Sequence, residues 1–335
     1  MKKIFLVYGL LVIIYLTYFG YYKYTSATNS EWTSSGVNGS INEKYVMVTF
    51  QSGMDYWKNC FKGFEDSANL LNVSVEYRGA MQRDVHEETT VMEQVISEHP
   101  SGIAVSAINS EALKNVIDKA VQDGIPVVTF DSGATGSKAY SFLGTNNYNA
   151  GEIAADKLAE LIKGKGNVAV ITLPNQQNHK DRTSGFVDEI KSDYPNIHVV
   201  AIENGKGDQL ASKEAAIKVL KKYPDLSGIF ATEANGGLGI AEAKKDMGSN
   251  THVKIISFDT DKGILDMVKN GTISATLSQG TWEMGYWALQ FLFQIKHGLI
   301  KSSSNESISM TSVPPNVDTG ITVVTKKNVD KFYSK

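Results

Sequence analysis

Residues 44–77 read KYVMVTFQSGMDYWKNCFKGFEDSANLLNVSVEY, and the order of residue types in this segment is the clearest indication of the architecture. Residues 45–50 are mainly β-branched and aromatic, residues 57–71 carry apolar side chains at helical spacing, and residues 73–77 return to the first pattern. A strand, a helix and a strand in this order predict a βαβ unit, in which the two strands are parallel. The strand runs are almost continuously apolar, as is typical of parallel strands covered on both faces.

The same alternation continues to residue 324. In the first half, further strands are predicted at 102–107 and 125–130, and helices at 87–98 and 111–122. In the second half, strands are predicted at 168–173, 197–202, 228–232, 254–258, 273–278 and 320–324. The helices of the second half are predicted at 150–162, 184–192, 212–222, 238–246, 262–269 and 284–297. Two complete series predict an α/β chain with two doubly wound parallel-sheet lobes. Ligands of open α/β sheets bind beyond the carboxyl ends of the strands, so we expect a shared cleft between the lobes.

The first 24 residues are expected to form an N-terminal membrane anchor. Lys2 and Lys3 precede an uncharged run over residues 4–22, and about twenty apolar residues span a bilayer. The two lysines favour the cytoplasmic side, which places the rest of the chain outside the cytoplasm. The alternative is a cleaved signal peptide, whose apolar run is usually shorter, roughly 7–15 residues. Residues 25–42 are rich in Ser, Thr, Asn and Gly, which is typical of a flexible tether.

Composition argues against several classes of function. The formal net charge is -3, and only three of the 33 basic residues are arginines, so the basic stripe of a nucleic-acid binder is absent and we expect no nucleic-acid partner. Cys60 is the one cysteine, so the chain can form neither an internal disulfide nor a cysteine metal cluster. We expect no metal, no cofactor and no catalytic residues.

Aromatic and acidic residues follow three of the expected strands. Tyr56 and Trp57 come in the loop after the first strand, and aromatic rings suit the C–H face of a sugar, although either ring could instead pack in the core. Asp131 and Asp259 end strands in opposite halves. An ionised carboxylate accepts strong hydrogen bonds from hydroxyl groups, although an aspartate here could also serve as a helix N-cap.

Three further polar residues stand beside strand ends in the second half. Arg182 has a rigid fork of donors, Glu233 follows the strand that ends at Thr232, and Gln279 offers both a donor and an acceptor. Such a set predicts a binding site for a polyhydroxylated ligand. Paired carboxylates could also hydrolyse a glycoside, but the arginine donor fits binding better.

Five segments together resemble the type I periplasmic binding proteins, the ribose- and xylose-binding group that also supplies the core of the lactose-repressor family. The segments are the Tyr56-Trp57 pair, IPVVTFD at 125–131, the R-x-x-G-F pattern at 182–186, ISFD at 256–259 and TLSQG at 276–280. The resemblance covers about residues 44–324 and implies three hinges between the lobes, near 145–147, 278–280 and 315–319. It implies an N-terminal lobe of residues 43–145 plus 280–317 and a C-terminal lobe of residues 146–279 plus 318–335. By resemblance, the ligand-binding residues are Tyr56, Trp57, Asp131, Arg182, Glu233, Asp259 and Gln279.

Two departures from the family pattern bear on the ligand. Ribose binders often have Arg where this chain has Ser132, and Asn where it has Glu233. The pocket is therefore not a standard ribose pocket, and the resemblance implies a pentose ligand, with xylose as the expected sugar; a peptide or autoinducer is the alternative. With the anchor, the chain resembles membrane-anchored pentose sensors that signal to a histidine kinase of the LytS type in a two-component system. The alternative partner is the permease of a sugar ABC transporter.

Overall fold

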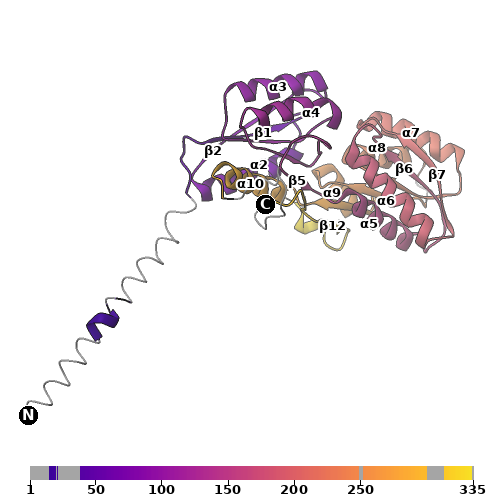
Figure 1. Ribbon diagram of the computed structural model, residues 1–335. Helices are drawn as coiled ribbons and strands as arrows, with labels where there is room; N and C mark the ends of the chain where they lie inside the picture. Colours follow the sequence, from indigo (N-terminus) through magenta and orange to yellow (C-terminus); the bar gives the residue numbers. More distant parts are fainter. Residues whose placement is uncertain (1–14, 20, 22–37, 249–251, 300–312, 334–335) are drawn as a thin grey trace, which may run out of the picture.

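The computed structural model describes residues 15–19, 21, 38–248, 252–299 and 313–333. Residues 38–248, 252–299 and 313–333 form two α/β lobes that lie side by side (Figure 1). Most of the expected anchor over residues 1–24 lies outside the described residues, as does most of the expected tether over 25–42. Within the described ranges, none of the helices combines the length and the apolar character needed to cross a bilayer.

The first lobe contains a six-stranded parallel sheet of order β11-β5-β4-β3-β1-β2. Its strands are β1 (Lys44–Thr49), β2 (Ser74–Gly79), β3 (Gly102–Val105), β4 (Val127–Phe130), β5 (Phe142–Gly144) and β11 (Asn316–Asp318). Its helices are α2 (Tyr56–Leu71), α3 (Val85–Ser97), α4 (Ser110–Gln122) and α10 (Thr281–Lys296). Figure 1 shows α3 and α4 above this sheet and α2 and α10 below it.

The second lobe repeats this plan, with strand order β12-β10-β9-β8-β6-β7. Its strands are β6 (Gly166–Thr172), β7 (Ile197–Asn204), β8 (Leu226–Ala231), β9 (Lys254–Phe258), β10 (Ala275–Gln279) and β12 (Ile321–Val324), and its helices are α5 (Asn147–Leu161), α6 (Gln177–Asp193), α7 (Gln209–Lys222), α8 (Ala234–Asp246) and α9 (Lys262–Asn270). All its strand pairs are parallel except β10 with β12. The prediction of two parallel-sheet α/β lobes is confirmed.

The core of the second lobe follows from the alternation of side chains along its strands. Val168 and Val170 point to the face covered by α5 and α6, whereas Ala169 and Ile171 point to the face covered by α7, α8 and α9. Because both faces carry helices, both sets of side chains are apolar, which explains the continuous apolar runs in the sequence.

The chain passes between the sheets in three places: residues 144–147, 279–281 and 318–321. That these segments bend as hinges stays a prediction, as do the lobe boundaries that were drawn from them.

Glycines allow one pair of helices in each lobe to approach closely. A Cβ at Gly63 of α2 would lie 2.0 Å from the carbonyl oxygen of Trp282 in α10. In the second lobe, a Cβ at Gly185 of α6 would lie 2.0 Å from the carbonyl oxygen of Tyr148 in α5. A side chain at either position would push the two helices apart, so these glycines determine how closely α2 packs against α10 and α6 against α5.

Candidate ligand-binding cleft

A cavity of about 70 Å³ lies between the lobes, and all seven residues predicted from the sequence line it. The other lining residues are Phe50, Met54, Arg83, Gln176, Asn178, His179, Ala234, Asn235 and Asp261. The cavity sits beyond the carboxyl ends of strands from both sheets, because β1 and β4 lead into it from one lobe and β8, β9 and β10 from the other. The structure therefore brings the predicted set together, while the role of each residue in binding stays a prediction.

Asp131 and Asp259 occupy matching positions in the two lobes. Each directly follows a strand, and each has a left-handed backbone conformation, with φ of 57° and 68° respectively. The Asp131 N–H donates to the carbonyl of Leu143 (3.0 Å), and the Asp259 N–H donates to the carbonyl of Leu277 (2.8 Å). A non-glycine residue with positive φ is uncommon, and such conformations concentrate at functional sites. Neither aspartate caps a helix through its side chain, so the N-cap alternative does not hold for them.

The carboxylate of Asp131 is held by two hydroxyl donors. Tyr56 donates its hydroxyl to Oδ1 at 2.6 Å, and Ser106 donates to Oδ2 at 3.1 Å. Burial raises the pKa of Asp131, whereas these hydrogen bonds and the charge of Arg182 oppose that rise. Because Tyr56 is positioned through its hydroxyl, its ring has a fixed orientation at the edge of the cavity.

Arg182 is the most constrained side chain of the site. Its Nε donates to Oδ1 of Asn147 at 2.8 Å, its Nη1 to the carbonyl of Thr232 at 2.8 Å, and its Nη2 to Oε1 of Gln279 at 3.0 Å. The guanidinium also stacks on the ring of Phe258. Only 2% of the residue's surface is exposed, and burial lowers its pKa against the pull of nearby carboxylates.

Gln279 connects the groups of both lobes. Its Oε1 accepts from Arg182 and from the hydroxyl of Thr145 at 2.8 Å. Its Nε2 donates to the Tyr56 hydroxyl at 3.0 Å and to Oδ1 of Asp259 at 2.7 Å. Burial raises the pKa of Asp259 to about 7, in spite of the nearby charge of Arg182.

Glu233 and Trp57 have structural roles as well as a place in the wall of the cavity. Glu233 caps α8, because its carboxylate accepts from the N–H groups of Asn235 (2.8 Å) and Gly236 (2.6 Å). Trp57 is 2% exposed, its Nε1 donates to the carbonyl of Phe50, and its ring meets neighbouring rings edge to face. Most of the Trp57 side chain therefore packs in the core, which was the alternative to ligand binding for this ring.

Sequence reasoning missed the polar groups that precede Arg182 at the start of α6. Gln176, Asn178 and His179 are all buried and line the cavity. Burial and the positive charge of Arg182 lower the pKa of His179 well below its usual range, so the ring is neutral. The sequence signal for these residues is a helix start that is strongly polar and lacks an apolar stripe. Such a start indicates a functional surface, because polar residues are rarely buried without a function.

Two hydrogen bonds that involve Gln176 join the lobes. Arg83 of the first lobe donates from Nη2 to Oε1 of Gln176 at 2.7 Å, and Gln176 donates from Nε2 to the carbonyl of Ile108 at 3.3 Å. The cleft is therefore bridged on the side of Gln176 by protein contacts alone.

The site has the chemistry of a binding pocket for a neutral, hydroxyl-rich molecule. Fixed carboxylates accept hydrogen bonds from hydroxyls, the arginine fork donates to ring or hydroxyl oxygens, and aromatic edges meet C–H groups. Across the residues that the structure describes, no group of three or more His, Cys, Asp or Glu side chains could hold a metal ion.

Comparisons with known proteins agree with this chemistry. The model of the periplasmic binding protein domain matches residues 45–299. The chain is similar to AraP, an arabinose binding protein from Geobacillus stearothermophilus, with 63% identity over 87% of this chain and 99% of that one and a TM-score of 0.80. A sugar-binding protein of a sugar ABC transporter from Bacillus halodurans is 57% identical over 87% of this chain and all of that one, with a TM-score of 0.81. A chain in the structure of a XylFII–LytSN complex is 28% identical over 86% of this chain and 99% of its own length, with a TM-score of 0.75.

Proposed function

The chain belongs to the periplasmic binding protein family, and from this premise we propose that it is an extracytoplasmic pentose receptor that closes on its sugar and signals to a membrane sensor histidine kinase. It is a sugar-binding protein of that family, and relatives of this kind are receptors or transport proteins and not enzymes. The observation that carries the proposal is the cavity between the lobes, which is lined by fixed carboxylates, an arginine fork and aromatic rings.

The division of the site between the lobes supports a closing mechanism. Tyr56 and Asp131 come from the first lobe, whereas Arg182, Glu233 and Asp259 come from the second. A sugar can contact both sets at once only when the lobes are closed. Its binding free energy then stabilises the closed state over the open one, and a partner protein can read the changed surface.

Arabinose is the sugar we propose. Xylose was the sugar expected from the sequence, but identity of 63% to an arabinose binding protein favours arabinose among the pentoses. The carboxylates of Asp131 and Asp259, the guanidinium of Arg182 and the amide of Gln279 would hydrogen-bond its hydroxyls, and Tyr56 would contact its ring.

Calorimetric titration of the full-length chain in detergent tests the ligand. L-arabinose, D-arabinose, D-xylose, D-ribose, D-galactose and D-glucose would be titrated in parallel. We expect tight binding of arabinose, lost in Asp259→Ala and unchanged in Asp123→Ala, a matched control on the outer surface. Binding of none of these sugars would refute the receptor proposal.

The partner we propose is a sensor histidine kinase beside an uncleaved N-terminal anchor. The apolar run over residues 4–22 and the likeness to a chain from a complex with LytSN support this proposal. Delivery of sugar to an ABC permease is the second candidate, which the similarity to the Bacillus halodurans transport protein favours. Cross-linking in native membranes with and without arabinose, followed by mass spectrometry, separates them: sensing predicts an intact N-terminus and a kinase partner, whereas import predicts permease subunits.

A further inference from the structure

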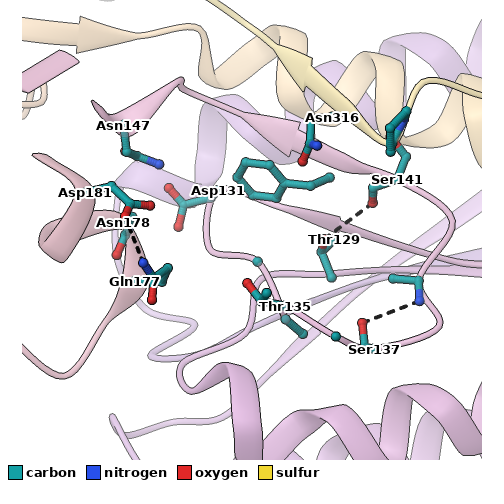
Figure 2. A pocket seen from close by; sticks show the side chains of 16 residues that line it. Thr129, Asp131, Thr135, Ser137, Ser141, Asn147, Gln177, Asn178, Asp181 and Asn316 are labelled. Atoms are coloured by element: carbon teal, nitrogen blue, oxygen red, sulfur yellow. Dashed lines mark hydrogen bonds between the residues drawn. The ribbon is translucent and has the colours of Figure 1, made fainter. Parts of the chain in front are cut away.

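A second cavity, of about 360 Å³, lies beside the central one and shares the side chains of Asp131 and Asn178 with it. Both lobes contribute to its wall. Figure 2 shows Asn147, Gln177, Asn178 and Asp181 of the second lobe on one side of this cavity, opposite Thr135 and Asn316. The volume of the side cavity lies within the range of small-molecule sites, roughly 300–1,000 Å³.

Several polar groups around the side cavity have unused hydrogen-bonding capacity. The side chains of Thr135 and Asn316 make no hydrogen bond to any other described residue. Asn147 uses its oxygen to accept from Arg182, so its amide nitrogen is free to donate, and Asp181 uses one oxygen to accept from Gln177. Within the described part of the chain, the cavity therefore offers amide, hydroxyl and carboxylate groups without a hydrogen-bond partner, which are the groups that recognise sugar hydroxyls.

An aromatic ring completes this wall. Phe142 is half-buried and lines the cavity. Its ring is fixed between two glycines, because a Cβ at Gly133 would lie 3.2 Å from it and a Cβ at Gly144 would lie 2.6 Å from it. The neighbouring backbone thus leaves room for a rigid aromatic surface, which can contact the C–H face of a sugar ring.

We propose that this side cavity is a second sugar subsite, so that the receptor also accepts a pentose-containing disaccharide. The inference rests on the proposed function, since the first sugar unit would occupy the central cavity. The central cavity of about 70 Å³ is too small for two sugar units. A substituent on the sugar would extend past Asp131 and Asn178 into the side cavity.

A third and larger cavity, of about 970 Å³, also adjoins the central one, but its wall suits a sugar less well. Two of the lysines in its wall already form ion pairs: Lys58 with Asp55 and Lys262 with Asp266, each at 2.7 Å. Its large volume and the ion pairs in its wall are typical of the entrance to a cleft and not of a sugar subsite.

Titration of the full-length chain with arabinose and with arabinobiose, an arabinose disaccharide, tests the second subsite. Thr135→Trp would fill the side cavity with an indole ring, and Asn316→Ala would remove one unpaired amide. We expect Thr135→Trp to raise the Kd for arabinobiose about tenfold or more, through steric exclusion. Asn316→Ala should raise it about fivefold, through the loss of one hydrogen bond. Both variants should leave the Kd for arabinose within about twofold, because neither residue lines the central cavity.

The results separate this inference from the function on which it rests. Arabinose binding without arabinobiose binding would overturn the second subsite alone. Equal weakening of both sugars in Thr135→Trp would also overturn it. If neither sugar binds the wild-type chain, both the second subsite and the pentose-receptor proposal fail.

Discussion

The guanidinium carbon of Arg182 lies 3.7 Å from the centre of the Phe258 ring. The stack fixes the plane of the guanidinium, and its hydrogen bonds to Asn147, Thr232 and Gln279 fix its rotation within that plane. A side chain held in this way loses little further entropy when a ligand binds, so its donors are pre-organised for the sugar.

Replacing Arg182 with lysine tests this pre-organisation. An ammonium group has no planar fork and cannot serve the same three acceptors, so we expect Arg182→Lys to weaken arabinose binding about tenfold to a hundredfold. Calorimetric titration measures the change. Arg78→Lys is the matched control, because Arg78 pairs with Glu76 and Glu98 outside the cavity. An unchanged Kd in Arg182→Lys would show that the fork does not contribute to binding.

Arabinose affinity should depend on pH through Asp259. Burial raises the pKa of this carboxyl group to about 7, so it is mainly protonated below pH 7 and ionised above. The ionised form accepts the stronger hydrogen bonds, so affinity should be highest above pH 7 and fall by up to about tenfold for each pH unit below it.

Titrations between pH 5 and 8.5 check this dependence. Asp259→Asn should bind weakly with a flatter pH profile, whereas Asp123→Asn, on the outer surface, should keep the wild-type profile. A wild-type Kd that does not change over this range would contradict the assignment.

The sequence predicted the strand ends well because a buried parallel strand can be recognised from its run of apolar residues. The apolar runs before Asp131 and Asp259 mark buried strands, and the first polar residue after each run must reach the edge of the sheet. These positions depend on local order alone, so one sequence was sufficient to find them.

Residues on the first turns of α6 were harder to find, because their burial comes from the opposite lobe. The sequence placed this helix at 184–192, whereas it begins at Gln177. Residues 177–183 have no apolar stripe, since Asn178, His179 and Arg182 face the cleft and not the core of their own lobe. The contact between Arg83 and Gln176 likewise joins lobes that only the folded chain brings together.

The close approach of α5 and α6 should be sensitive to a single methyl group. In Gly185→Ala the new Cβ would meet the carbonyl oxygen of Tyr148 at 2.0 Å, so the helices must separate. We expect the free energy of unfolding to fall by about 1–3 kcal/mol. Arabinose affinity should fall too, because α6 carries Arg182. Urea denaturation and calorimetry measure the two effects.

Gly53→Ala is the control for that substitution, because a Cβ at Gly53 has no neighbour within 4 Å and the residue lacks a positive φ. Its stability should match the wild-type chain. Wild-type stability in Gly185→Ala would mean that the helices can separate without cost.

Glu88 should make stability fall as pH rises. Its side chain is fully buried on α3, one oxygen accepts from the N–H of Ile108 at 3.0 Å, and the other has no partner among the described residues. Burial raises the pKa of Glu88 to about 8, above the value of 4.5 for an exposed glutamate. A raised pKa in the folded state means that the contribution of this group to stability is complete below pH 4.5 and is lost as pH rises towards 8. The slope attributable to Glu88 should be about 1 kcal/mol per pH unit in this window.

Urea denaturation at pH 5.5, 6.5 and 7.5 should therefore show a steeper decline in the wild-type chain than in Glu88→Gln, which cannot ionise. Glu93→Gln, on the exposed face of the same helix, should retain the wild-type slope. Parallel curves for the wild-type chain and Glu88→Gln would show that Glu88 does not ionise at a raised pKa in the folded protein.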